Sequence, residues 1–187
     1  ESDSLRSQVE YWRQQLAAPR AILDLPTDYR RPPVQTFVGA THPFTIPATV
    51  VQTVKTVAQR HEATLFMVLL AAFKVFLYRY SRQTDLIVGT PIANRTRAEL
   101  EPLIGFFVNT LVMRADITGE MTFRTLLQQT RTRTLEAYAH QDLPFEQLVM
   151  ELNPARDLSR SPLIQSLFVL QNAPLPALQM QDVTLTP

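Results

Sequence analysis

The stretch that decides the fold is T-L-F-M-V-L-L-A-A-F-K-V-F-L-Y-R-Y-S-R (residues 64–82), followed two residues later by D-L-I-V-G-T-P-I-A (residues 85–93). Thr64 can cap a helix over residues 65–82, whose first half is apolar almost all the way round. We therefore expect this helix to run through the middle of the protein. The second segment is rich in Ile and Val and ends in a bend marked by Gly and Pro, which is typical of a short strand.

Further elements follow on both sides of this stretch. Helical spacing of apolar residues predicts amphipathic helices over residues 5–16, after Pro47, from Thr122 and over 145–152, with a short helical turn at 98–103. In the helix from Thr122 we expect five side chains to face inward: Phe123, Leu126, Leu127, Leu135 and Tyr138. Strands are predicted at residues 36–46, 106–117, 164–171 and 183–186. This order predicts an α+β two-layer sandwich, in which helices cover a mainly central mixed sheet.

Composition narrows the class of protein. The chain has 187 residues, is 45% hydrophobic and contains ten Phe, enough apolar surface for one folded core. Eighteen basic against seventeen acidic residues give a charge of +1, which does not indicate a nucleic-acid partner. No cysteine is present, so disulfides and thiolate chemistry are excluded, and a cytoplasmic location is expected. The longest apolar run is well short of the ~20 residues of a membrane span.

Three segments place polar residues among apolar ones. They are I-G-F-F-V-N-T (residues 104–110), H-Q-D-L-P-F-E (140–146) and R-D-L-S-R-S-P-L (156–163). Each has a structural explanation. Gly105 suits a tight entry into a strand, and Asn109 suits a buried hydrogen bond. The second segment lies at a junction of two helices, where His140, Asp142 and Glu146 are favoured by free backbone groups and helix dipoles.

The third segment can close on itself through an ion pair of Asp157 with an arginine and through serine turn bonds. Arg156 and Arg160 near a serine also suit a phosphate group. A metal site built from His140, Asp142 and Glu146 is conceivable, but these residues do not have a recognised ligand spacing, and we expect no metal. The four glycines form no phosphate loop, and no serine lies in a nucleophile elbow.

Taken together, the three segments resemble the condensation domains of nonribosomal peptide synthetases. They match motifs of the forms G-x-F-V-N-T with a following arginine, H-Q-D-x-P-F-E and R-D-x-S-R-x-P-L. Glu10-Tyr11-Trp12, residues 25–32 and residues 89–95 are also similar to that family, so the resemblance covers nearly the whole chain. The close match of H-Q-D-L-P-F-E favours a peptide-forming domain over the heterocyclisation and epimerisation types.

The resemblance implies a fold and a division of labour. Condensation domains have two lobes related to chloramphenicol acetyltransferase, which form a V around a tunnel with carrier-protein sites at its two mouths. This chain resembles the C-terminal lobe, and we expect residues 1–187 to be truncated at both ends. The family's H-H-x-x-x-D-G motif belongs to the N-terminal lobe and does not occur in this sequence. No residue of this chain is therefore expected to be the catalytic histidine.

The resemblance also implies roles and partners. Asn109, Gln141 and Asp142 are predicted to be tunnel-side or loop-organising residues. A structural role is predicted for the other motif residues, which are Gly105, His140, Pro144, Glu146, Arg156, Asp157 and Arg160. The expected partners are the N-terminal lobe, upstream and downstream carrier proteins and a neighbouring adenylation domain. This lobe is expected to bind no cofactor, because the substrates ride on 4'-phosphopantetheine arms of the carriers.

The expected function is the formation of an amide bond between an upstream acyl or peptidyl thioester and a downstream aminoacyl thioester. Two alternatives remain at this point. One is a catalytically silent, condensation-like scaffold or recruitment module. The other is a free-standing acyltransferase that uses coenzyme A.

Overall fold

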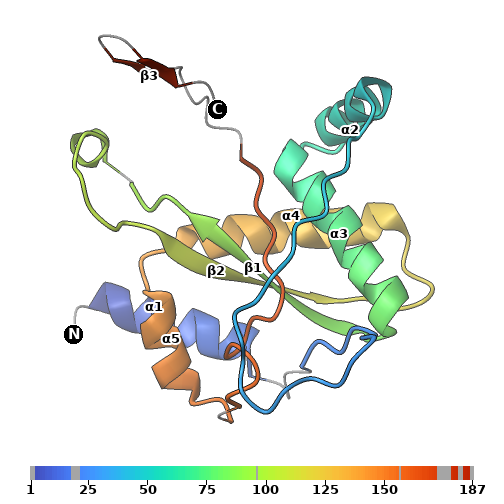
Figure 1. Ribbon diagram of the computed structural model, residues 1–187, viewed down its shortest axis with the longest axis horizontal. Helices are drawn as coiled ribbons and strands as arrows, with labels where there is room; N and C mark the ends of the chain where they lie inside the picture. The colour runs from blue at the N-terminus through green and yellow to red at the C-terminus, as the bar shows by residue number, and fades with distance from the viewer. Residues whose placement is uncertain are drawn as a thin grey trace.

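A two-stranded antiparallel sheet lies at the centre of the protein (Figure 1). The computed structural model describes residues 3–17, 22–95, 97–155, 157–171, 178–180 and 183–185. Strand β1 (Asp85–Ile92) pairs with β2 (Asn109–Asp116), and the register runs from Asp85 opposite Asp116 to Ile92 opposite Asn109. The start of β2, where the first polar segment ends, therefore lies next to the end of β1.

Helices pack around this sheet, as the sequence predicted. Their bounds are α1 (Asp3–Gln15), α2 (Ala48–Arg60), α3 (Leu65–Ser81), the 3₁₀ turn η1 (Ala98–Leu100), α4 (Phe123–Ala139) and α5 (Phe145–Leu152). Helices α3 and α4 pack against each other and against the sheet, and α1 packs beside α5 (Figure 1). A second hairpin pairs β3 (Leu178–Met180) with β4 (Val183–Leu185). The α+β class with a small sheet covered by helices is confirmed.

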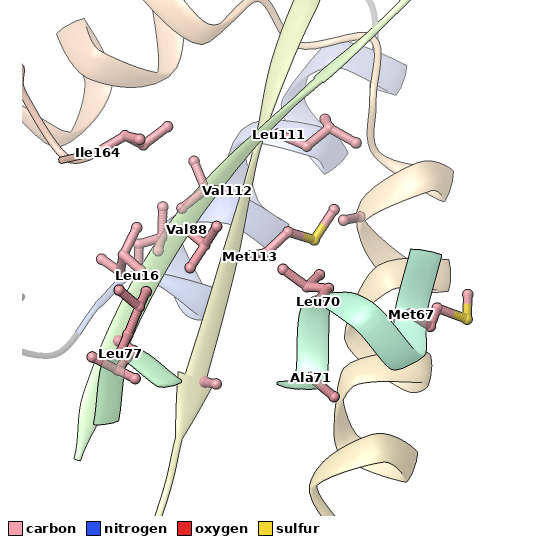
Figure 2. Packing of buried hydrophobic residues seen from close by; sticks show 14 of the residues in the cluster. Leu16, Met67, Leu70, Ala71, Leu77, Val88, Leu111, Val112, Met113 and Ile164 are labelled. Atoms are coloured by element: carbon pink, nitrogen blue, oxygen red, sulfur yellow. The ribbon is translucent and has the colours of Figure 1, made fainter. Parts of the chain in front are cut away.

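Helix α3 is the buried element that the opening stretch predicts. Thr64 caps it, because its hydroxyl oxygen accepts a hydrogen bond from the Met67 backbone N–H at 3.2 Å. Its Leu70 and Ala71 are completely buried, and Figure 2 shows them with Val88 of β1 and Met113 of β2. One core therefore joins this helix to both strands.

Lys74 is an unusual member of this core, because only 1% of its surface is exposed. Burial disfavours a charged ammonium group, and the nearby Arg133 guanidinium repels it. These two effects lower the pKa of Lys74 from 10.5 to about 7.

Arg114 of β2 is held by a paired carboxylate. Its guanidinium donates to both carboxylate oxygens of Asp85, at 2.8 and 2.9 Å, and to the backbone oxygen of Gln15 at 3.1 Å. Arg133 of α4 in turn donates to the backbone oxygen of Arg114 at 2.8 Å. This network ties the end of α1 and the side of α4 to the same point of the sheet.

The sheet is smaller than the sequence suggests. Residues 36–46, predicted to be a strand, lie extended and mostly exposed, and they form no strand. Within the described residues no neighbouring backbone pairs with them, so their β-branched and aromatic composition is not sufficient to make a strand. Phe37 even has a positive φ of 57°, which a strand residue does not adopt.

The other predicted strands are confirmed in part. The strand predicted at 106–117 begins only at Asn109, and β4 covers most of 183–186, of which residue 186 lies outside the described residues. Residues 164–171 touch β1 through a single parallel bridge between Gly89 and Leu167. Together with the antiparallel pair, this parallel bridge gives the mixed pairing that was predicted.

Gly89 makes the parallel contact possible. Its N–H donates to the Ser166 backbone oxygen, and its own oxygen accepts from the Phe168 N–H, both at 2.9 Å. A Cβ atom at this position would lie 2.6 Å from Leu167 Cδ2 and 2.8 Å from Ile164 Cγ2. A side chain larger than hydrogen would fit between β1 and this segment only if Leu167 and Ile164 shifted.

The buried face of α4 differs from the prediction. Leu126 and Leu127 are buried as expected, but Phe123, Leu135 and Tyr138 are exposed. The rest of the buried face consists of small residues, which are Thr130, Thr134 and Ala137. Small side chains allow α4 to pack closely against its neighbours α3 and β2, and the Thr134 hydroxyl donates to the Thr130 backbone oxygen at 2.7 Å.

Among the described residues, no single helix has the length and apolar character needed to cross a membrane. Helices α2 and α3 meet those two criteria only as a pair, which is bent by 107°.

Candidate functional site

Asn109 stands at the start of β2 and uses both ends of its side chain. It is 7% exposed. Its amide nitrogen donates to the backbone oxygens of Gln141 at 2.8 Å and Leu143 at 2.9 Å. Its carbonyl oxygen accepts from the backbone N–H groups of Phe145 at 3.0 Å and Thr110 at 2.8 Å. The first polar segment thus binds directly to the second.

His140 ends α4 and begins the loop of residues 140–144. Its Nδ1 lies 2.8 Å from the Glu136 backbone oxygen, and its ring stacks on Tyr11 with centroids 3.9 Å apart and planes at 7°. Trp12 Nε1 donates to the His140 backbone oxygen at 2.9 Å. Burial and the neighbouring Glu136 carboxylate raise the pKa of Tyr11 to about 12, with a smaller opposing effect of Arg133. Helix α1 therefore covers the start of the loop.

Gln141 and Asp142 face different surroundings. Gln141 is half-buried, and its backbone oxygen is the part of it that Asn109 binds. Asp142 is exposed, and one of its carboxylate oxygens accepts a hydrogen bond from Gln8 Nε2 at 3.1 Å. Asp142 is thus tied to α1, while Gln141 is tied to β2.

Pro144 is the N-cap residue of α5, and Glu146 lies exposed in the first turn of that helix. A carboxylate in this position interacts favourably with the helix dipole. The structure does not assemble His140, Asp142 and Glu146 around a cation. Within the part of the chain that is described, no three His, Asp or Glu side chains gather closely enough to hold a metal ion.

Gly105 precedes β2 by several residues. It is exposed, and a Cβ atom added to it would lie 3.1 Å from the Phe107 ring. The Arg95 guanidinium lies over the Phe107 ring, with its central carbon 4.2 Å from the ring centroid. Its guanidinium also donates to the backbone oxygens of Leu100 and Glu101. Gly105 therefore gives the Phe107 ring room and does not form the first residue of the strand.

The third segment closes on itself as predicted. Asp157 Oδ1 accepts from both the N–H and the hydroxyl of Ser159, at 2.8 and 2.7 Å, and Arg160 Nε lies 3.8 Å from the other carboxylate oxygen. The hydrogen bonds from Ser159, chiefly, lower the pKa of Asp157. The backbone oxygen of Leu158 accepts from the Gln35 N–H at 2.9 Å. Arg156 lies outside the described residues.

The three segments meet at one cavity of about 370 Å³. Thr110 of the first segment, Phe145 of the second and residues 159–162 of the third line it, together with Arg31, Gln35, Ile164, Gln165 and Leu167. Arg160 also lines a second cavity of about 610 Å³, which extends between α5 and residues 157–165. Residues far apart in the sequence thus form a common concave surface.

Sequence reasoning did not identify the contribution of α1 to this site. Gln8 and Trp12 lie one helical turn apart and reach the loop 134 and 128 residues further along the chain. Both are buried. The sequence signal that could have indicated a polar contact is a glutamine on the apolar face of an amphipathic helix, one turn before a tryptophan.

The chain belongs to the condensation domain family, because the family model matches residues 1–186. This confirms the resemblance seen in the sequence. A linear gramicidin synthase of Brevibacillus parabrevis is 52% identical over 187 residues, which are 100% of this chain and 2% of that protein. A plipastatin synthase of Bacillus subtilis (strain 168) is 44% identical and matches 98% of this chain and 5% of its own length. The chain thus spans a small part of these relatives.

Solved structures agree in fold. Holo-AB3403, a four-domain nonribosomal peptide synthetase bound to AMP and glycine, superimposes with a TM-score of 0.88 at 29% identity, covering 92% of this chain and 13% of that one. The X-domain from teicoplanin biosynthesis gives a TM-score of 0.83 at 29% identity, covering 89% of this chain and 37% of that one.

Proposed function

We propose that residues 1–187 act as the C-terminal lobe of a condensation domain that forms amide bonds between carrier-bound substrates, and that this lobe supplies one wall of the substrate tunnel. The observation that carries the proposal is the meeting of the three family segments at one cavity of about 370 Å³. The identity of 52% to a linear gramicidin synthase supports it. So does the match to 37% of the X-domain chain, a share that fits one lobe of a larger domain.

The proposed reaction joins an upstream acyl or peptidyl thioester to the amine of a downstream aminoacyl thioester. The amine nitrogen attacks the thioester carbon, a C–N bond forms, the C–S bond breaks, the nitrogen loses a proton and the thiol leaves. Holding both tethered reactants in line can supply up to roughly 7–11 kcal/mol in ideal intramolecular cases. The contribution that we assign to this lobe is positioning, through a rigid wall.

The rest of the chemistry is assigned to partners. The N-terminal lobe would supply the H-H-x-x-x-D-G histidine, because this sequence has no such motif. The substrates would arrive on 4'-phosphopantetheine arms of upstream and downstream carrier proteins, next to an adenylation domain. In this proposal the lobe binds no cofactor of its own, works in the cytoplasm and is inactive alone.

The test is a reconstitution. The complete domain is supplied with loaded donor and acceptor carriers, and the dipeptidyl thioester is measured by mass spectrometry. We expect product with the complete domain and none with residues 1–187 alone. Product from this chain alone would overturn the assignment of the reactive group to the other lobe, and no product from a complete domain with an intact H-H-x-x-x-D-G would overturn the enzymatic function.

A recruitment module is the second candidate. The X-domain from teicoplanin biosynthesis, which matches this chain at a TM-score of 0.83, has also been solved in a complex with OxyB. A domain of this fold that binds another protein is therefore among the similar structures. The same reconstitution separates the two candidates, because a recruitment module gives no dipeptide even with both loaded carriers present.

A further inference from the structure

The loop of residues 140–144 is held from two sides. On one side, Asn109 of β2 binds the backbone of Gln141, Leu143 and Phe145. On the other side lies α1, whose Gln8 is 5% exposed and belongs to none of the three polar segments. Gln8 thus contacts the middle of the loop although it lies outside the three motifs.

The two ends of the Gln8 amide have different partners. Its Nε2 donates to Asp142 Oδ2 at 3.1 Å, and its Oε1 accepts from the Leu143 N–H at 2.8 Å. Because the Leu143 N–H can only donate, the oxygen of Gln8 must face it and the nitrogen must face the Asp142 carboxylate. Glutamate has no donor, and Lys or Arg has no acceptor, so none of them can make both bonds.

These two bonds fix the peptide unit that leads into α5. Leu143 is buried, Pro144 follows it as the N-cap residue, and Phe145 lines the cavity of about 370 Å³. Rotation of the peptide between Asp142 and Leu143 would break the hydrogen bond from the Leu143 N–H to Gln8. A shift of this peptide would also move the first residue of α5, and with it one part of the cavity wall.

We propose that Gln8 is a positioning residue, which sets the orientation of the Asp142 carboxylate and the position of the start of α5. The proposed effect of Gln8 on the loop does not depend on what the protein does. Its proposed effect on catalysis rests on the proposed condensation function. The two parts are therefore tested by different measurements.

The first measurement is amide hydrogen exchange of the Leu143 N–H by NMR in the complete domain. Gln8→Glu keeps an acceptor for the Leu143 N–H but replaces the donor to Asp142 with a second carboxylate, so at pH 7 we expect exchange faster than in the wild type and slower than in Gln8→Met. Protection should return as the pH falls below about 5, where the two carboxylates share a proton. Gln8→Met keeps the length of the side chain but neither hydrogen bond, and its exchange should be fast relative to the wild type at every pH.

Other titratable or charged groups near the loop include His140, Tyr11, Glu136, Arg133 and Glu146. They are present in all variants, so the difference between Gln8→Glu and Gln8→Met isolates the added carboxylate. Gln14→Glu is the control on the same helix, because Gln14 is exposed and its side chain binds Glu10 of its own helix. Wild-type protection of Leu143 in Gln8→Met, or the same pH profile in both Gln8 variants, would overturn the proposal.

The second measurement uses the complete domain with loaded carriers. Gln8→Met should lower kcat about tenfold and leave the KM for the carriers within about twofold, because positioning acts after the carriers dock. If the wild-type domain makes no dipeptide, the proposed function fails and the exchange data still decide the role of Gln8. If the wild type is active and Gln8→Met loosens the loop without slowing the reaction, the catalytic part of the proposal is wrong.

Discussion

At the residue scale, Asn109 connects a strand to a loop with four hydrogen bonds from one side chain. Asn109→Asp removes the donor and leaves two buried backbone oxygens, of Gln141 and Leu143, facing a carboxylate. We expect a loss of about 2–4 kcal/mol in the free energy of unfolding, measured by urea titration. The control is Asn94→Asp, since Asn94 has a positive φ of 51° that both residue types adopt. Equal stability of the two variants would contradict the role given to Asn109.

Lys74 gives a prediction with a defined pH window. Folding lowers the pKa of Lys74 from 10.5 to about 7. Between these values the unfolded chain holds a proton that the folded chain lacks, so the free energy of unfolding rises with pH, by up to about 1.4 kcal/mol per unit from this group. Below pH 7 both states are protonated, and the cost of burying the charge is constant.

Lys74→Met keeps most of the side-chain volume and removes the charge. We expect it to be more stable than the wild type at pH 7 and to lose the rise in stability from pH 7 to 9.5, measured by urea titration across that range. Above this range Tyr11, whose pKa is raised to about 12, gives a slope of the opposite sign. Lys55→Met, at an exposed position of α2, is the control and should leave the slope unchanged. A Lys74→Met variant that keeps the wild-type slope would refute the explanation.

At the scale of elements, Gly89 decides whether residues 164–168 can join the sheet. In Gly89→Ala the added methyl group meets the exposed Leu167 side chain, which can move, and the buried, β-branched Ile164, which cannot. We expect a loss of about 1–3 kcal/mol, as for other overpacked sites, together with loss of exchange protection at the Phe168 N–H.

A double-mutant cycle tests the contact with Ile164 directly. Ile164→Ala removes the atoms that clash, so the destabilisation of the double variant should be smaller than the sum of the two single effects by at least about 0.5 kcal/mol. Additive effects would mean that the methyl group is accommodated elsewhere, and that Gly89 is not required for this approach.

The elements also show what the sequence could and could not predict. Helices α3 and α5 were predicted within one or two residues of their bounds, because spacing, caps and prolines act locally. The prediction of a strand at residues 36–46 was wrong, because a strand requires a neighbouring strand to pair with, and composition does not reveal whether one is present. The predicted inward face of α4 was partly wrong, because Thr130 and Thr134 are buried in place of larger apolar residues.

The same distinction applies to the site. Asn109, His140 and Asp157 were identified from local motifs, and the structure gives each of them hydrogen bonds. The contacts of Gln8 and Trp12 with the loop were not predicted, because their partners lie more than a hundred residues away in the sequence. Pairing over such distances depends on the assembled fold and leaves no local pattern.

At the scale of the whole molecule, large apolar side chains remain on the surface. Phe37 and Phe106 are 85% and 88% exposed, and Ile104 is completely exposed. They lie in the segments at residues 36–46 and 104–108, neither of which is a helix or a strand. Exposed apolar side chains of this size are typical of surfaces that another protein body covers. In the proposed function that body is the N-terminal lobe.

This surface predicts how the chain behaves alone. Without a cover, residues 1–187 should self-associate at micromolar concentrations, because burial of apolar surface drives association. The double variant Ile104→Ser and Phe106→Ser should shift the weight-average mass in sedimentation equilibrium toward that of the monomer. The control is Met150→Ser, which removes a large apolar side chain that is 72% exposed on α5, and it should leave the mass unchanged. The prediction would be contradicted if the wild-type chain were monomeric, or if Met150→Ser lowered the mass as much as the double variant. Either result would show that Ile104 and Phe106 do not form the surface through which the chain associates. If the complete domain is monomeric while this chain alone associates, the surface is covered by the rest of the domain.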